Sequence, residues 1–152
     1  MAIVLGWREW VSLPALGFAA VRAKVDTGAR SSALHVERQW RFVQEGAPWV
    51  GFCIRPSVRQ GAMEAAAPVR DERDVRDSGG RLTRRVFICT PLRLAGVEHD
   101  IEINLADRRD MLFPLLLGRT ALSGTFVVDP QRSFLHGRAR RMHNTSKDAT
   151  DQ

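Results

Sequence analysis

The segment Phe18–Val25 runs directly into the tetrapeptide Asp26-Thr27-Gly28-Ala29, and this junction constrains the fold more than any other part of the chain. Apolar residues alternate with basic ones before it (Val21, Ala23 and Val25 against Arg22 and Lys24). Such a period is typical of a strand with one apolar and one basic face. Because glycine permits sharp turns and close backbone approach, we expect the strand to end in a tight loop at Gly28.

A carboxylate, a hydroxyl and a glycine at the end of a strand are the functional groups found in one half of an aspartic peptidase site. In that chemistry two Asp side chains face each other across a water and share one proton, since both cannot ionise together. One carboxylate then acts as base and the other as acid. The other interpretation of Asp26-x-Gly28 is an ordinary Asx turn at the end of a strand.

A second motif favours the first interpretation. The apolar run Leu115-Leu116-Leu117 is followed by Gly118, Arg119 and then Leu122. We expect this segment to open a short helix around Arg119 to Ser123 that Gly124 closes.

With both motifs the chain resembles the retropepsins, and in particular the retropepsin-like bacterial proteins catalogued as ATP-dependent zinc proteases and found near RimK-type ATP-grasp glutamate ligases. The resemblance also includes these segments: Gly6-Trp7-Arg8-Glu9-Trp10, Lys24 through His35, Asp77-Ser78-Gly79-Gly80, Thr90-Pro91-Leu92-Arg93-Leu94 and Asp129-Pro130.

The resemblance implies an all-β fold, a closed six-stranded acid-protease barrel with one short helix. It assigns catalysis to the loop of Asp26, Thr27 and Gly28, where the Thr27 hydroxyl would bond across a dimer and the Gly28 amide would bond the carboxylate. Ala29 and Arg30, with Gly79 and Gly80 of a flap, would bind substrate. The supporting residues would be Leu117, Gly118 and Arg119.

The coarse pattern of short apolar or alternating segments between turn residues agrees with an all-β chain. The strands we expect are Glu9–Leu13, Phe18–Val25, Ala33–Val43, Trp49–Arg55, Glu64–Val75, Arg81–Cys89, Val97–Leu105, Met111–Leu117, Phe126–Asp129 and Ser133–Leu135. Ile101, Ile103 and Leu105 alternate with Glu102 and Asn104, which predicts one buried and one wet face.

A length of 152 residues is enough for one domain. We expect residues 1–137 to form the barrel and the basic, polar residues 138–152 to be a disordered tail. A two-lobed enzyme would need about twice the length of one domain. Asp77-Ser78-Gly79 lacks a preceding apolar strand, and Asp129 precedes Pro130. The second catalytic Asp should therefore come from another copy, in a twofold homodimer.

Arg30 departs from the retroviral pattern, in which an acidic residue commonly follows Asp-Thr-Gly-Ala and pairs with the Arg of the second motif. Arg119 must then find another partner, for which Asp107, Asp110 and Asp129 are candidates. Beside a cleft, Arg30 would favour substrate carboxylates through charge-assisted hydrogen bonds. The alternative is a surface or structural arginine.

The run from Arg70 to Asp77 leads into Ser78-Gly79-Gly80, which predicts a charged hairpin with a flexible tip. Its position along the chain matches the flap of retropepsins, which closes over substrate and excludes water. A plain solvated hairpin has the same composition.

The chain is basic, with 23 Lys and Arg against 17 Asp and Glu and a pI near 10.8. This charge favours an anionic partner, and the family context suggests an acidic peptide such as a glutamate-rich tail made by a ligase. We do not expect nucleic acid, because no RNP, KH or helix-turn-helix pattern is present. The alternative function is a catalytically silent barrel that binds acidic peptides or RNA and partners an ATP-grasp ligase.

A zinc-dependent protease ranks third, and we expect neither metal nor cofactor. The four histidines are scattered, Cys53 and Cys89 stand apart, and there is no H-E-x-x-H or Cys-x-x-Cys motif. The sequence also has no P-loop for ATP. Two distant cysteines and the lack of a signal or membrane-spanning run favour a cytoplasmic location without membrane contact.

Overall fold

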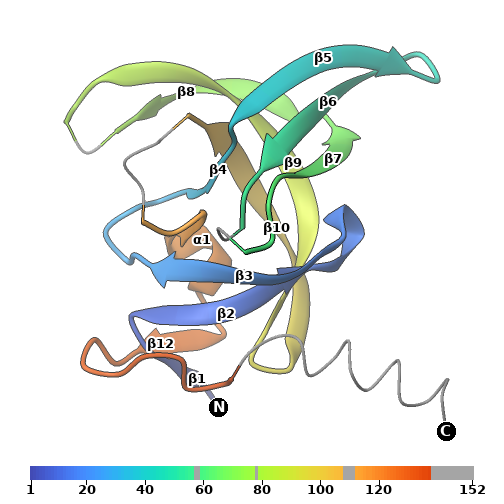
Figure 1. Ribbon diagram of the computed structural model, residues 1–152. Coiled ribbons are helices and arrows are strands. Elements are labelled where there is room, and N and C mark those ends of the chain that lie inside the picture. Colours follow the sequence, from blue (N-terminus) through green and yellow to red (C-terminus); the bar gives the residue numbers. More distant parts are fainter. Residues whose placement is uncertain (57–58, 78, 108–111, 138–152) are drawn as a thin grey trace, which may run out of the picture.

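The computed structural model describes residues 1–56, 59–77, 79–107 and 112–137 (Figure 1). Strands dominate this part of the chain. They are β1 (Ile3–Leu5), β2 (Arg8–Leu13), β3 (Phe18–Val25), β4 (Ser32–His35), β5 (Arg38–Gln44), β6 (Ala47–Ile54), β7 (Met63–Pro68), β8 (Asp71–Arg76), β9 (Leu82–Leu94), β10 (Val97–Ala106), β11 (Leu115–Leu117) and β12 (Phe126–Val128). The helices are a 3-10 turn η1 (Pro14–Leu16) and α1 (Arg119–Leu122).

Six strands close into a ring. Their hydrogen-bonded order is β10-β4-β11-β3-β2-β9, and β9 pairs with β10 again. The short strand β11 is parallel to β3 and antiparallel to β4, so it lies between the strands on either side of the Asp26 loop. The predicted fold class, an all-β six-stranded closed structure with one short helix, is confirmed.

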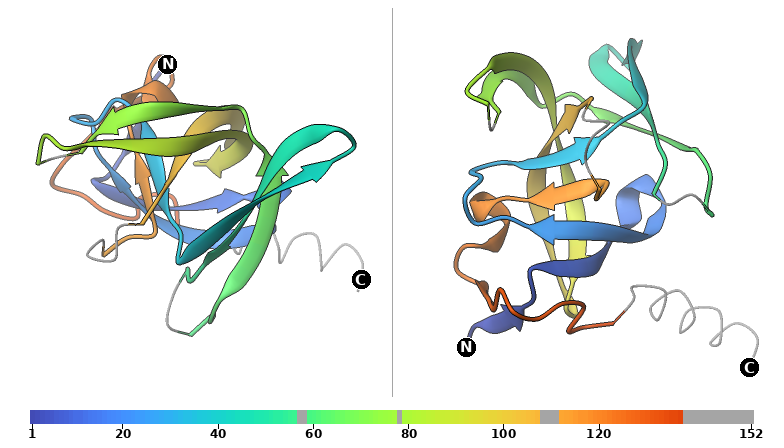
Figure 2. Two further views of the ribbon diagram at one scale, coloured as in Figure 1. Left: turned by 90° about the horizontal axis from the view of Figure 1, so that it is seen from above. Right: turned by 60° about the vertical axis from the view of Figure 1, so that its left-hand side comes forward.

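Two further sheets flank the ring. Strands β5, β6 and β7 form an antiparallel sheet that stands to one side of it (Figure 2). Strand β8 extends the ring sheet by pairing with the first half of β9, and together they form a hairpin that overhangs the ring. Strands β1 and β12 make a short parallel pair close to the N-terminus.

The core fills the ring with aliphatic side chains from each of its six strands. Val21 and Ala23 are fully buried, as the alternation in this segment predicts. Ile103 is also fully buried, with Ile101 and Leu105 nearly so. The expectation of a wet face at Asn104 is wrong: its side chain is buried, because it bonds to a neighbouring strand and to an arginine at the site described below.

Two predicted strands are each divided in the structure, because the chain passes from one sheet to another within them. In Ala33–Val43, Val36 N donates to Ala106 O of the ring, whereas Glu37 N donates to Cys53 O of the side sheet. In Glu64–Val75, Val69 N donates to Pro48 O and Arg70 N donates to Phe87 O.

The end of the described chain also differs from expectation. The segment 133–135 is not a strand. Its backbone is instead held by the buried carboxylate of Glu9, which accepts hydrogen bonds from Leu135 N and His136 N.

Helix α1 spans Arg119–Leu122, and Gly124 follows it with a φ of 85°, so the predicted helix is confirmed.

Candidate active site

Asp26 lies immediately after β3 and is fixed by its backbone. Its N–H donates to Leu117 O at 2.9 Å, and its carbonyl accepts from Ala29 N at 3.2 Å. Its Oδ1 accepts a hydrogen bond from Gly28 N at 2.9 Å. This last contact is the geometry of an Asx turn, and it also orients the carboxylate with one oxygen held. The Asx turn and the peptidase loop are therefore the same local structure, and the surroundings must decide between them.

Arg119 holds the Asp26 loop from the second motif. Its N–H donates to Ala29 O at 2.8 Å, and its Nη1 donates to Thr27 O at 3.1 Å and to Gly28 O at 3.2 Å. Among the described residues the guanidinium thus bonds to carbonyl oxygens and to no carboxylate. The expectation of an Asp107 or Asp129 partner is not met, and Asp110 lies outside the described residues.

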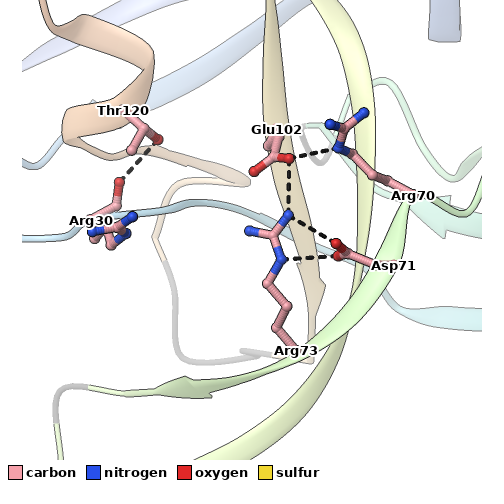
Figure 3. Close-up of polar contacts among 6 residues, drawn as sticks. All are labelled: Arg30, Arg70, Asp71, Arg73, Glu102 and Thr120. Atoms are coloured by element: carbon pink, nitrogen blue, oxygen red, sulfur yellow. Dashed lines mark hydrogen bonds and ion pairs between the residues drawn. The ribbon is translucent and has the colours of Figure 1, made fainter.

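Gly118 and Thr120 complete the junction between the two motifs. Gly118 N donates to the buried Ser32 Oγ at 3.1 Å. A Cβ on Gly118 would lie 2.5 Å from Ser31 O, so only glycine fits there. Thr120 N donates to Arg30 O at 3.2 Å. Thr120 Oγ1 donates to the same oxygen at 3.1 Å (Figure 3). Segments about ninety positions apart therefore form one rigid unit around Asp26.

A cleft of about 740 Å³ opens in front of Asp26. Its floor is a row of side chains that the strand registers place on one face of the sheet. The row runs through Lys24, Leu116, Ala33, Asn104 and Phe87, on β3, β11, β4, β10 and β9. One wall is the loop of Asp26, Gly28, Ala29 and Arg30. The other wall is formed by residues 73–76 of β8 and by Asp77 just after it, and the predicted flap segment therefore shares a cleft with Asp26.

The tip of this hairpin is ordered by Asp77. Its Oδ1 accepts from Gly79 N at 3.0 Å and from Arg81 N at 2.9 Å, and Arg76 Nη1 donates to Gly80 O at 2.8 Å. Gly79 and Gly80 are exposed at the tip and do not line the cleft in this arrangement, whereas Asp77 does.

The base of the hairpin is fixed to β10 by an ion-pair network (Figure 3). Arg73 donates to Asp71 at 3.0 Å and to Glu102 at 2.9 Å, and Arg70 pairs with Glu102 at 2.8 Å. The Arg73 guanidinium also lies 4.1 Å from the centre of the Phe87 ring. The hydrogen bond from Arg73 lowers the pKa of Glu102, and the bond to Glu102 raises the pKa of Arg73.

Basic side chains outnumber acidic ones in the cleft. The lining cations are Lys24, Arg30, Arg73, Arg76 and Arg85, against Asp26, Asp74 and Asp77. Sequence reasoning had singled out only Arg30 among these cations. Lys24 could have been found, because it precedes Asp26 by two positions and so shares its face of the strand. Arg73 and Arg76 belong to the predicted flap, whereas Arg85 and Asn104 reach the cleft through long-range strand pairing, which leaves no local signal.

His99 and His136 each contact a backbone oxygen, on different parts of the fold. His99 Nε2 contacts Ala121 O at 3.0 Å, and His136 Nε2 contacts Val4 O at 2.7 Å. No group of three or more His, Cys, Asp or Glu side chains that could hold a metal ion occurs in residues 1–56, 59–77, 79–107 and 112–137. The described residues therefore do not fit a zinc centre. In the same residues, no helix combines the length and apolar character needed to cross a bilayer.

The fold and the paired motifs are those of the retropepsin-like class of proteins. A model of the family described as "RimB-like: Retropepsin-like aspartic endopeptidase RimB" matches residues 4–139. The chain therefore belongs to the RimB-like family of retropepsin-like proteins, and the predicted resemblance is confirmed.

Relatives with other names match the same region. A protein of Shewanella halifaxensis named probable alpha-L-glutamate ligase is 37% identical over 136 residues, which cover 88% of this chain and 30% of that protein. A protein of Parasynechococcus marenigrum with the same name is 36% identical and is likewise covered over 30% of its length. The chain thus spans about a third of the curated relatives it matches. The crystal structure of Lpg0085 from Legionella pneumophila, a protein of unknown function, superposes with a TM-score of 0.77 at 26% identity, covering 90% of this chain and 99% of that one.

Proposed function

We propose that this protein is an aspartic endopeptidase whose site forms between two copies of the chain, with one Asp26 from each. The observation that carries the proposal is the placement of the Asp26-Thr27-Gly28 loop, braced by Gly118 and Arg119, at the wall of an open cleft. A bare Asx turn would need neither the brace nor the cleft.

The other carboxylates of the cleft are engaged elsewhere. Asp77 accepts two backbone hydrogen bonds at the hairpin tip, and Asp74 pairs with Arg84 at 3.7 Å. A second Asp26 from another copy would complete a dyad that shares one proton. Thr27 suits this arrangement because it is exposed, and its hydroxyl has no hydrogen-bond partner among the described residues. It is thus available to a second copy.

The dyad would cut an amide without a covalent intermediate. The ionised Asp26 takes a proton from the bound water, whose oxygen adds to the amide carbonyl carbon, while the protonated Asp26 of the second copy donates to the carbonyl oxygen. Transfer of a proton to the nitrogen then breaks the C–N bond and releases a carboxylic acid and an amine. The flap wall of the cleft, β8 and its tip with Gly79 and Gly80, would exclude water and hold the peptide backbone.

The substrate class we propose is an acidic peptide or protein segment, because the cleft holds five cations against three carboxylates. Complementary charge raises the local concentration and the encounter rate of such a peptide. Arg30 and Ala29 lie at the rim where substrate would bind.

The test compares the unaltered protein with Asp26→Asn on glutamate-rich and mixed peptides from acid to neutral pH, with and without chelator. Cleavage that is lost in the variant, insensitive to chelator and more than first order in protein concentration at low concentration is the expected result. Chelator-sensitive cleavage, or cleavage that survives Asp26→Asn, would contradict the proposal.

A second candidate is a binding module that presents acidic peptides to a glutamate ligase. It is favoured by the relatives named probable alpha-L-glutamate ligase, of which this chain matches 30%. Under this candidate the protein binds acidic peptides equally well before and after Asp26→Asn and cuts none of them. Co-purification with an ATP-grasp ligase from the same cell would support the partnership.

A further inference from the structure

We propose that Lys24 and Arg30 form an anion subsite on either side of Asp26 that binds substrate carboxylates next to the scissile bond. The inference rests on the proposed peptidase function and deepens it, because it assigns the preference for acidic peptides to two side chains and not to the overall charge.

The cations of the cleft fall into two groups. Arg73 is bound to Asp71 and Glu102, Arg76 to Gly80 O, and Arg85 to Thr83 Oγ1 and Asn104 Oδ1. Arg73 and Arg85 therefore each have two side-chain partners in the hairpin and the floor, and Arg76 is bound to the hairpin tip.

Lys24 and Arg30 form the other group. Both are exposed and line the cleft, and neither side chain makes a hydrogen bond or an ion pair to any described residue. An unpaired cation in a cleft keeps its full donor capacity for a ligand. These two residues are thus the cations that can bind a substrate carboxylate without breaking a contact that the fold uses.

Their positions suit side chains that flank a bond held at Asp26. Lys24 lies near the end of β3, two positions before Asp26 and roughly 7 Å from it along an extended chain, and both residues line the cleft. Arg30 lies beyond the turn, and its carbonyl is fixed by Thr120, so its backbone is rigid while its guanidinium is free. An extended peptide advances about 3.3 Å per residue, so neighbouring side chains lie within reach of both cations. Lys24 offers a point charge, and Arg30 offers a fork that can bind a carboxylate through two hydrogen bonds.

The twofold axis of the proposed dimer doubles this subsite. One pair of cations would then lie on each side of the scissile bond, since the peptide runs through both half-sites. The substrate should therefore need acidic residues on both sides of the bond, and loss of the acids on either side should slow cleavage.

The experiment uses four peptides with one cleavable bond: Glu on both sides, Gln on the amino side, Gln on the carboxyl side, and Gln on both. They are tested on the unaltered protein, Lys24→Gln, Arg30→Gln and the double variant. Arg59→Gln is the matched control, because Arg59 is exposed and lies outside the cleft. We expect the unaltered protein to favour Glu on both sides by about tenfold or more in kcat/KM, as for loss of a charge-assisted hydrogen bond.

The double variant should lose most of that preference, because its kcat/KM should fall far more for the peptide with Glu on both sides than for the peptide with Gln on both sides. Arg59→Gln should retain the preference. An equal loss on all four peptides, or an unchanged preference, would overturn the subsite. Binding of the same peptides to Asp26→Asn, with and without Lys24→Gln and Arg30→Gln, separates the two proposals. If nothing is cut but Glu peptides bind through these cations, the peptidase proposal fails and the subsite stands.

Discussion

Gly118 and Ser32 meet across 86 positions of sequence, where the N–H of the glycine donates to the buried serine hydroxyl at 3.1 Å. The contact joins the second motif to the strand that follows the Asp26 loop. Because Asp26 N also bonds to Leu117 O, the loop is held at both of its ends by the same short segment. The position of the carboxylate thus depends on residues that a local reading of the loop does not include.

The first prediction concerns Gly118→Ala. The new Cβ would lie 2.5 Å from Ser31 O and 2.8 Å from Arg30 O. Both atoms belong to the backbone, which cannot move aside at low energetic cost. The backbone of Gly118 itself is ordinary (φ −91°), so the cost comes from contact alone. We expect a loss of about 1–3 kcal/mol in the free energy of unfolding, as for overpacking. Urea unfolding measures it.

Gly79→Ala is the matched comparison for stability, because its Cβ would meet only Asp77 Oδ1, at an ordinary 3.4 Å. An unfolding free energy of Gly118→Ala equal to that of Gly79→Ala would contradict the proposed close packing.

The second prediction concerns Arg119→Met. The guanidinium bonds to Thr27 O and Gly28 O at an exposed position, so its loss should cost little stability. Without it the loop is less fixed, and misplacement of a catalytic group by about 1 Å can cost 10²-fold in rate. We therefore expect kcat to fall by at least about tenfold, with KM and the melting temperature nearly unchanged. Arg119→Lys should recover part of kcat, because one donor can still reach a carbonyl oxygen.

Several parts of this picture could be predicted from sequence, and each has a local cause. The strand that leads into Asp26 follows from the alternation of apolar and basic residues. The helix after Gly118 follows from Gly and Arg at the end of the apolar run 115–117. The hairpin after Arg70 follows from its turn residues. The pairing of β11 between β3 and β4 could not be derived from periodicity, because three apolar residues fit many partners.

The cleft floor was missed for a related reason. Asn104 lies in an alternating segment that predicts a wet position, yet its side chain bonds to Ser32 O and Arg85. Whether a polar side chain such as that of Asn104 is buried depends on which strands pair with its own strand. That pairing depends on how the whole ring closes. Asp107 and Asp129 were wrong as partners for Arg119, because the guanidinium bonds to backbone carbonyls among the described residues, and every sequence offers such acceptors.

The third prediction is a dependence on pH at the base of the hairpin. Hydrogen bonding to Arg73 lowers the pKa of Glu102 below its ordinary value in the unfolded chain. The folded form therefore gains stability from this pair above the unfolded pKa and loses it as pH falls through the folded pKa, below about 4.5. Glu102→Gln should destabilise the protein at pH 7, and the difference should shrink as the pH falls below about 4.5.

Unfolding by urea at several pH values measures this difference. The effect should be modest and should weaken in high salt, because Glu102 is about a third exposed. Glu64→Gln removes a more exposed pair, with Arg38, and provides the comparison. A Glu102→Gln deficit that stays constant from pH 7 to pH 3 would contradict the ion-pair origin.

The last prediction concerns Glu9, a carboxylate with no exposed surface that joins the two ends of the described chain. Its Oε2 accepts from Gly6 N at 2.7 Å and Leu135 N at 3.1 Å, and its Oε1 accepts from His136 N at 3.4 Å. In Glu9→Gln one oxygen becomes an NH₂ group, which cannot accept, so at least one of these three N–H groups loses its acceptor. An unsatisfied buried donor costs about 1–3 kcal/mol. Urea unfolding should show that loss, and hydrogen exchange at Leu135 and His136 should accelerate more than exchange in β3. Equal acceleration of hydrogen exchange throughout the ring would contradict this prediction. It would mean that Glu9 stabilises the whole fold and not specifically the segment after Asp129.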